Sequence, residues 1–241
     1  MKFKTSNIIT SSVKAPDTSI LIIYTGGTLG MVHNDKGALI PFDFASIMDH
    51  IPSLRHLELN ITALSFDNPI DSSNINPSHW TLLGQMIYNN YSEYDGFVVL
   101  HGTDTMAFTA SAISFMLENL NKPVIFTGAQ LPISAPRSDA RENLITALEI
   151  ASTKVYEKPM VPEVAVYFDS FLLRGNRSKK VESVHFDAFQ SENYPLLAEA
   201  GVVIKYNDKF IHQSGENLGL TLHTGFNNNV VILKLFPGIG K

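Results

Sequence analysis

Five short apolar runs lie between residues 20 and 168, and each has the character of a strand buried on both faces. They cover residues 20–24, 61–66, 97–100, 123–126 and 163–168. Strands covered on both sides in α/β proteins are almost continuously apolar, whereas half-exposed strands alternate apolar and polar residues. The pattern therefore predicts a buried central sheet.

Helical periodicity fills several of the segments between these runs. Asn76-Pro77 is typical of an N-cap followed by a proline at the first helical position. Two further helices are expected from about Asp104 to Asn119 and from about Ser138 to Ser152. Strands that alternate with helices predict an α/β fold with a doubly wound parallel sheet and helices on both faces.

The two ends of the chain lack this alternation. Residues 1–17 are rich in Ser, Thr and Lys and are predicted to form a flexible tail, which leaves residues 18–205 as the N-terminal α/β domain. Residues 206–229 contain several Asn, Asp and Gly and are predicted to be a linker with short strands. The apolar run Val230–Phe236 predicts a new strand, so residues 230–241 are interpreted as the truncated start of a second, smaller domain.

Composition narrows the possible partners and the cellular location. The 241-residue chain is 44% hydrophobic, carries a formal net charge of −5 and has no Lys/Arg cluster suited to a nucleic-acid backbone. Cysteine is absent, which excludes disulfides and thiolate metal sites and fits a reducing compartment. Neither a signal-peptide core nor an apolar run of membrane length is evident. We therefore expect a cytoplasmic protein with no nucleic-acid or membrane partner.

Two of the predicted strands end in glycine-containing turns that carry hydroxyl groups. Thr25-Gly-Gly-Thr28 follows the first strand, and His101-Gly-Thr-Asp-Thr105 follows the third. Ligands bind beyond the carboxyl ends of parallel strands, where glycine permits positive φ and a close approach of the backbone. We therefore predict that the Thr28 and Thr103 hydroxyls face each other across a gap one small molecule wide. The structural alternative is a tight turn with incidental threonines, and Thr103 or Asp104 as the N-cap of the following helix.

Polar turns also follow the second and fourth strands. These are Asp71-Ser72-Ser73 and Thr127-Gly-Ala-Gln130. Taken singly, an ordinary Asp/Ser turn is the simpler interpretation of the first, but four polar turns at successive strand ends favour a site. Lys180 lies in a polar loop after the fifth strand, where a lysine is usually solvated. Buried beside a hydroxyl, it would be able to act as a base.

Taken together, these motifs resemble those of the bacterial type I (cytoplasmic-type) L-asparaginases, over roughly residues 19–240. The two threonine motifs are highly specific when both occur at this spacing. The resemblance implies hydrolysis of L-asparagine to L-aspartate and ammonia through an acyl-threonine intermediate, in a homodimer or tetramer, with no metal or organic cofactor. The stretches that carry it are Tyr24–Met31, Asp71–Ser73, Asp95–Met106, Ser114–Leu120, Lys122–Ile125 and Arg174–Arg177.

The resemblance implies catalytic roles for four residues, Thr28, Thr103, Asp104 and Lys180. Thr28 falls at the position of the acylated nucleophile. Thr103 and Lys180 fall at the positions of a pair that activates the second step or orients water. A threonine hydroxyl is a poor nucleophile until a neighbour takes its proton, and the tetrahedral intermediate needs an oxyanion hole. We expect backbone N–H groups of the glycine turns, at Gly27 and Gly102, to supply that hole.

The resemblance also implies a set of substrate-binding residues. Asp104, beside Thr103, falls at the position that binds the substrate's α-amino group. Asp71, Ser72 and Ser73 fall on the loop that holds the α-carboxylate and the α-amino group.

The sequence departs from the family pattern in three places. The flap of residues 33–41 lacks the tyrosine that many relatives place beside the nucleophile. Lys179 precedes Lys180, so a one-residue shift would exchange them, and we assign the role to Lys180. Relatives continue into a complete C-terminal domain that also completes the neighbour's site. We therefore expect this chain to be weakly active or inactive, with residues 230–241 poorly anchored or paired with another chain.

Two other functions stay open on the sequence. The first is a non-catalytic amino-acid-binding remnant of the same family, which ammonia release from asparagine would exclude. The second is an amidase that acts on glutamine or on a glutaminyl ester carried by tRNA. The absence of a basic face counts against the tRNA version, and a comparison with glutamine separates the rest.

Overall fold

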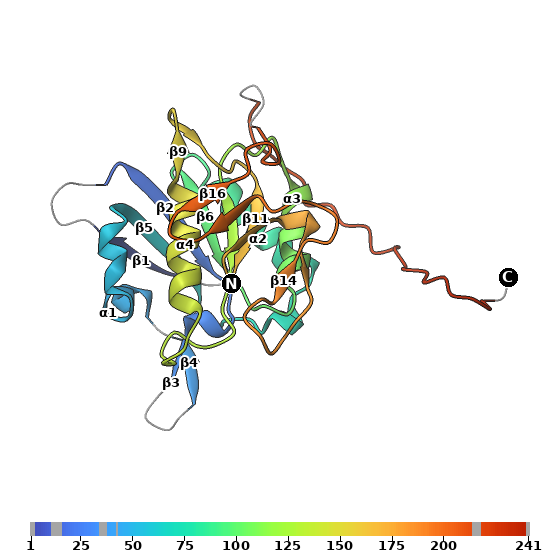
Figure 1. Ribbon diagram of the computed structural model, residues 1–241, viewed down its shortest axis with the longest axis horizontal. Coiled ribbons are helices and arrows are strands. Elements are labelled where there is room, and N and C mark those ends of the chain that lie inside the picture. The colour runs from blue at the N-terminus through green and yellow to red at the C-terminus, as the bar shows by residue number, and fades with distance from the viewer. Residues whose placement is uncertain (1–2, 11–15, 34–37, 42, 214–217, 240–241) are drawn as a thin grey trace.

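The computed structural model describes residues 3–10, 16–33, 38–41, 43–213 and 218–239 (Figure 1). Within these ranges nine strands form one sheet, in the order β1-β5-β2-β6-β8-β11-β12-β15-β16. Their bounds are β1 Phe3–Ile9, β2 Thr18–Tyr24, β5 Leu59–Phe66, β6 Gly96–Leu100, β8 Val124–Thr127, β11 Val164–Phe168, β12 Phe171–Arg174, β15 Ala198–Ala200 and β16 Ile204–Tyr206.

The middle of the sheet is parallel, which confirms the predicted fold class. Strands β5, β2, β6, β8 and β11 run in the same direction, with Ile22 of β2 between Ala63 of β5 and Val98 of β6. Each predicted apolar run overlaps one of these five strands. Strand β1 at one edge and β12, β15 and β16 at the other are antiparallel, and the apolar runs did not predict them.

Helices cover both faces of the sheet, as predicted (Figure 1). The Asn76 side chain accepts from the Ser78 N–H at 3.0 Å, so the predicted N-cap is confirmed. The next helix has Thr105 as its N-cap, so the alternative of Thr103 or Asp104 as cap was wrong. The helices are α1 Ile47–His50, α2 Pro77–Asn89, α3 Met106–Met116 and α4 Ala140–Ser152, with 3-10 turns η1 Thr28–Gly30, η2 Phe44–Ser46, η3 Pro52–His56, η4 Ser72–Asn74 and η5 Gly175–Arg177.

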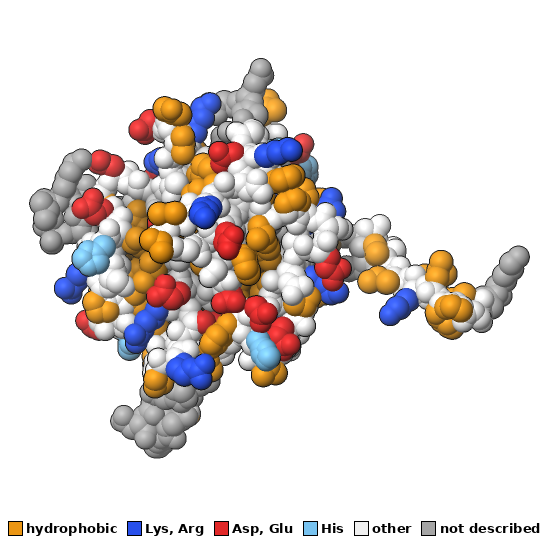
Figure 2. Space-filling model, in the orientation of Figure 1, with side chains coloured by type: hydrophobic (Ala, Val, Ile, Leu, Met, Phe, Trp, Pro, Cys, Tyr) orange, Lys and Arg blue, Asp and Glu red, His pale blue; other side chains and the backbone are white. Residues whose placement is uncertain are grey.

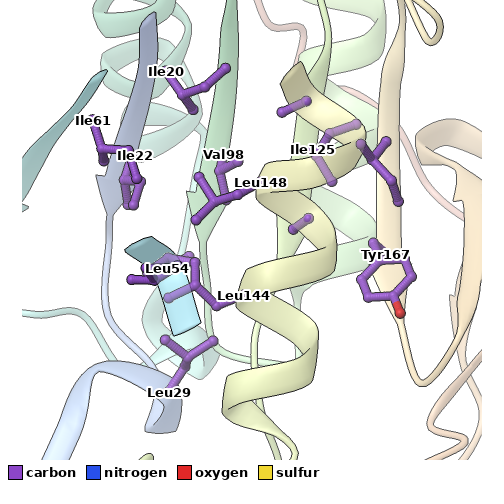
Figure 3. Packing of buried hydrophobic residues seen from close by; sticks show 14 of the residues in the cluster. Ile20, Ile22, Leu29, Leu54, Ile61, Val98, Ile125, Leu144, Leu148 and Tyr167 are labelled. Atoms are coloured by element: carbon purple, nitrogen blue, oxygen red, sulfur yellow. The ribbon is translucent and has the colours of Figure 1, made fainter. Parts of the chain in front are cut away.

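The core consists of two apolar layers separated by the sheet. Because successive strand residues point to opposite faces, Ile22 packs into the layer beneath α4, whereas Ile23 packs beneath α2 and α3. Figure 3 shows the first layer, where Leu144 and Leu148 of α4 lie against the strands near Val98. A rigid, double-sided core of this kind fixes the strand ends from which the site is built.

Residues 3–9 correct the predicted flexible tail of residues 1–17. They form β1, which pairs antiparallel with β5 and places Ile8 opposite Ile61. Only Ser6 and Ile8 of this strand are buried. The strand is therefore held mainly by backbone hydrogen bonds to an exposed sheet edge, and such pairing leaves no apolar pattern in the sequence.

The predicted strand over Val230–Phe236 is also corrected. These residues have no regular secondary structure, and in Figure 1 they project away from the body of the domain. Figure 2 shows apolar side chains along this segment, and Ile232 is 93% exposed. A strand needs a partner for its N–H and C=O groups, and the described chain offers none here. A second domain over residues 230–241 stays a prediction.

Part of the predicted linker of residues 206–229 is bound to the domain. Strand β17 (Thr221–Leu222) pairs with β7 (Leu117–Glu118), and the side chain of Leu222 packs on the α2/α3 layer. Among the described residues, no helix is long and apolar enough to cross a membrane. The other short strand pairs are β3 Met31–His33 with β4 Leu39–Pro41, β9 Lys154–Val155 with β10 Lys158–Pro159, and β13 Lys179–Lys180 with β14 Phe189–Gln190.

Candidate active site

Four loops meet at the carboxyl ends of the parallel strands. They follow β5, β2, β6 and β8, which are neighbours in the sheet. The chain leaves β2 for β5 on one side and then crosses to β6 on the other, so β2 marks a topological switch point. Ligands of open α/β sheets bind in the crevice at such a point. The topology thus agrees with the place that the sequence predicts for the site.

The turn after β2 is tied to the end of β6. The Thr25 N–H and Oγ1 both donate to the Leu100 carbonyl, at 3.0 and 3.1 Å. Gly27 has φ 91°, and a Cβ on it would lie 2.6 Å from the Gly102 nitrogen. Side chains rarely adopt that φ, and no side chain fits that space. The glycine therefore lets the Thr28 turn touch the Thr103 turn backbone to backbone.

The loop that follows β5 is fastened to both turns. The Ile70 N–H donates to the Thr25 carbonyl at 2.8 Å, and a Cβ on Gly26 would lie 2.1 Å from the Ile70 carbonyl oxygen. Ser72 is buried, and its carbonyl accepts from Thr105 Oγ1 at 2.7 Å. The predicted substrate-binding loop and the two threonine motifs therefore form one connected assembly.

Asp71 and Ser73 present their side chains to solvent at the rim of this assembly. Asp71 Oδ1 accepts from both the backbone N–H and the hydroxyl of Ser73, at 2.9 Å each. These hydrogen bonds favour the ionised carboxylate and hold the pKa of Asp71 below its ordinary value. The loop thus offers a fixed negative charge to an ammonium group.

Lys180 reaches the second threonine motif, as predicted. Its Nζ donates to Thr103 Oγ1 at 2.9 Å and to Asp104 Oδ1 at 2.7 Å. The Lys180 side chain is 14% exposed, whereas Lys179 is 65% exposed and pairs with Glu192. The expectation that Lys180 and not Lys179 lies at Thr103 is confirmed.

Strand β13 explains why two adjacent lysines differ so sharply. Lys179 and Lys180 are consecutive residues of this strand, and consecutive strand residues point to opposite sides. Lys180 is paired with Phe189 of β14, and the Phe189 ring packs against Phe168 at the end of β11, with ring centroids 5.1 Å apart. The hydrophobic contact secures the strand that carries the lysine.

Two site residues were not assigned by sequence reasoning. Thr103 Oγ1 lies 3.4 Å from Gln130 Oε1, and Gln130 Nε2 donates to the His185 carbonyl at 3.1 Å. The Asp139 carboxylate accepts from the Gln130 and Leu131 N–H groups at 2.9 and 3.1 Å. The polar turn ending at Gln130 was visible in the sequence, but a carboxylate that binds backbone N–H groups has no signature there.

His101 is a packed residue of the second motif. It is 1% exposed, and its Nδ1 lies 2.8 Å from the Gly102 carbonyl. Burial lowers the pKa of His101 to about 4, so the ring is neutral near pH 7 and donates through Nδ1. Among the described residues, no group of three His, Cys, Asp or Glu is placed to hold a metal ion.

Thr28 lies at the start of η1 with a half-buried side chain. The contact between Gly27 and Gly102 brings its turn to that of Thr103. The face-to-face arrangement of the two hydroxyls stays a prediction. The tip of the tyrosine-free flap, residues 34–37, lies outside the described residues.

Comparisons with known proteins place these motifs in context. The model of the family described as "Asparaginase, N-terminal" matches residues 19–212. Human 60 kDa lysophospholipase is 40% identical over 93% of this chain and 42% of its own length, and L-asparaginase 1 of Escherichia coli K12 is 40% identical over 92% and 64%. The crystal structure of L-asparaginase I from Vibrio cholerae matches with TM-score 0.81 and 38% identity, over 92% of this chain and 66% of that one. The chain thus spans less than two thirds of each of these relatives.

Replacing Gly27 with alanine tests the backbone contact at the centre of the site. The new Cβ would meet Gly102 at 2.6 Å with φ at 91°. We expect Gly27→Ala to lower the free energy of unfolding by roughly 2–4 kcal/mol, because positive-φ strain and steric overlap add. Urea denaturation measures this. Gly225→Ala is the matched control, because nothing lies within 4 Å of its Cβ position. Equal stability of the two variants would contradict the contact.

Proposed function

The chain belongs to the asparaginase N-terminal family, and on that premise we propose that its site hydrolyses the side-chain amide of L-asparagine to L-aspartate and ammonia. One observation carries the proposal: Lys180 donates to Thr103 and Asp104 at 2.9 and 2.7 Å, next to the glycine turn that bears Thr28. A hydroxyl that is hydrogen-bonded to an amine, beside a second hydroxyl on a glycine turn, is suited to acyl transfer. The reaction proposed here uses no metal or organic cofactor.

Acylation begins with attack of Thr28 Oγ1 on the amide carbon of asparagine. The hydroxyl proton passes to the leaving nitrogen as the C–N bond breaks, which releases ammonia and leaves an aspartyl ester on Thr28. Backbone N–H groups at Gly27 and Gly102 stabilise the oxyanion of the tetrahedral intermediate. Preorganised N–H donors of this kind are commonly the largest single contribution to catalysis of acyl transfer.

Deacylation uses the Lys180–Thr103 pair. A water molecule held by the Thr103 hydroxyl attacks the ester carbon. As the new C–O bond forms, Thr103 Oγ1 takes a proton from the water and passes its own proton to the Lys180 amine. As the ester bond breaks, the proton returns through Thr103 to Thr28 Oγ1. Lys180 is suited to this task because its side chain is mostly buried and Asp104 fixes its amine.

The polar loops orient the substrate's α-groups. Asp71 and Asp104 carry carboxylates that match the α-ammonium group, and Ser72 and Ser73 supply hydrogen-bond donors for the α-carboxylate. The aspartates and hydroxyls at the edge of the site thus match the α-ammonium and α-carboxylate groups of a small amino acid. A cytoplasmic location and assembly into a homodimer or tetramer stay predictions from the family.

The choice among acyl substrates is a separate proposal, for which we favour asparagine. Glutamine carries the same α-groups on a longer side chain. A lysophospholipid ester, which the name of the human relative suggests for that protein, would pass through the same acyl-threonine. The charged rim at Asp71 and Asp104 favours an amino acid. The kcat/KM values of the protein for asparagine, glutamine and a lysophospholipid test this choice, and we expect the value for asparagine to be the highest.

Thr28→Ala tests the nucleophile. Whatever the absolute rate of the purified chain, we expect ammonia release from asparagine to fall by at least about a thousandfold, because no other group can carry the acyl intermediate. Thr28→Ser retains a hydroxyl and is the matched control, with measurable turnover. A coupled ammonia assay with circular dichroism as the check on folding suffices. Retention of a tenth of the activity by the alanine variant would overturn the assignment.

Lys180→Met and Lys179→Met form a matched pair that tests the relay. Lys180→Met removes the donor to Thr103 and should lower kcat about a hundredfold or more, since proton transfer contributes roughly 10²–10⁴-fold. Lys179→Met removes only an exposed ion pair with Glu192 and should leave kcat within about twofold. If Lys179→Met were the damaging change, the relay as described would be wrong.

A further inference from the structure

Tyr24 lies directly beneath the turn that carries Thr28. It is the last residue of β2, is 1% exposed, and its hydroxyl donates to the Gly27 carbonyl oxygen at 3.1 Å. Thr28 is joined to that carbonyl, because the Gly27 C=O and the Thr28 N–H belong to one peptide group. The tyrosine therefore holds one end of the peptide that precedes the proposed nucleophile.

The Tyr24 ring is closely confined in this position. A Cβ on Gly30 would lie 2.5 Å from Cε2 and Cζ of the ring and 2.9 Å from its oxygen, so the turn closes over the tyrosine only because residue 30 is glycine. On another side the ring packs against Phe44, with centroids 5.3 Å apart. A ring held by contacts of this kind gives its hydroxyl one direction.

Pinning the Gly27 carbonyl fixes the direction of the Thr28 N–H. In a trans peptide the C=O and N–H point in opposite directions, and the described chain has no cis peptide bond. The carbonyl points down to Tyr24, which belongs to the buried layer beneath α4. The Thr28 N–H therefore points away from Tyr24 and from the buried layer to which Tyr24 belongs.

We propose that Tyr24 is a positioning residue that aims the Thr28 N–H at the oxyanion of the tetrahedral intermediate, as a donor additional to the Gly27 and Gly102 N–H groups, and this proposal rests on the acyl-transfer function proposed above. The hydroxyl acts through the peptide and does not touch the substrate. A hydrogen bond to the carbonyl also polarises the peptide, which makes the N–H a stronger donor. Burial raises the pKa of Tyr24 above its ordinary value, so the phenol keeps its proton and stays a donor.

The test is Tyr24→Phe, which keeps the ring and removes only the hydroxyl. Tyr194→Phe is the matched control, because the Tyr194 hydroxyl also donates to a backbone carbonyl, that of Phe210, at 3.1 Å. Tyr194 lies beside Arg174, which binds Glu163 at the amino end of β11, away from the proposed site. Each variant thus loses one tyrosine-to-backbone hydrogen bond.

We expect Tyr24→Phe to lower kcat about tenfold with KM for asparagine unchanged. Complete loss of an oxyanion donor costs roughly 10²–10³-fold, and here the donor stays but loses its orientation. Tyr194→Phe should keep kcat within about twofold. The amide resonance of Thr28 in a ¹H–¹⁵N spectrum should shift in Tyr24→Phe, whereas that of Ile211, which follows Phe210, should shift in Tyr194→Phe.

The two readouts separate this proposal from the proposed function. If wild-type protein hydrolyses asparagine and Tyr24→Phe keeps kcat within twofold, the positioning role is overturned even when the Thr28 amide moves. If wild-type protein does not hydrolyse asparagine, the proposed function falls, and the amide resonance decides alone. An unmoved Thr28 amide then overturns the positioning role, and a selective shift of that amide supports the hold of Tyr24 on the Thr28 peptide.

Discussion

The contact between the Gly27 and Gly102 backbones is the constraint on which the rest of the site depends. The Thr28 turn and the Thr103 turn come from neighbouring parallel strands, and a side chain on Gly27 would hold them apart. A Cβ on Gly27 would reach the Gly102 nitrogen, and one on Gly102 would lie 2.6 Å from Ser72 Oγ. Three loops therefore share one small volume because two of their residues have no side chain.

Hydrogen bonds to the backbone hold these loops in register with the sheet. Thr25 binds the Leu100 carbonyl, Ile70 binds the Thr25 carbonyl, and Thr105 binds the Ser72 carbonyl. The first two bonds join neighbouring strands of the sheet, β2 with β6 and β5 with β2, and the third joins the loops after β5 and β6 across the end of β2. The buried sheet thus transmits its rigidity to the proposed catalytic groups. Asp139 does the same for Gln130 on the other side of Thr103. A site of this kind is preorganised by its own backbone.

Much of the fold was predictable because burial on both faces leaves continuous apolar runs. Strand β1 was not predictable, because it is held by backbone pairing with β5. Its exposed residues, such as Lys4 and Thr5, form no apolar run in the sequence. The strand predicted over Val230–Phe236 was wrong for the opposite reason. Its composition is that of a strand, but no neighbouring strand is available in the described chain. The composition of a segment indicates whether it can form a strand, and a pairing partner determines whether the strand forms.

The site was predictable where chemistry and spacing coincide. Hydroxyls on two glycine turns pointed to Thr28 and Thr103, and the family pattern pointed to Lys180. Lys180 and Lys179 differ only because successive residues of β13 point to opposite sides. A strand of two residues is too short to be recognised from a sequence pattern. Asp139 and Tyr24 act on backbone groups, which are the same in every residue. Sequence reasoning therefore found the side chains proposed to contact the substrate and missed those that hold the backbone.

The most direct test of the account is the identity of the acylated residue. Protein mixed with L-asparagine is quenched in acid during turnover, digested, and its peptides are sequenced by mass spectrometry. The account predicts an aspartyl ester on Thr28, in the peptide that contains Gly26 and Gly27. An ester on Thr103, or sustained turnover with Thr28 unmodified under conditions where deacylation limits the rate, would contradict it.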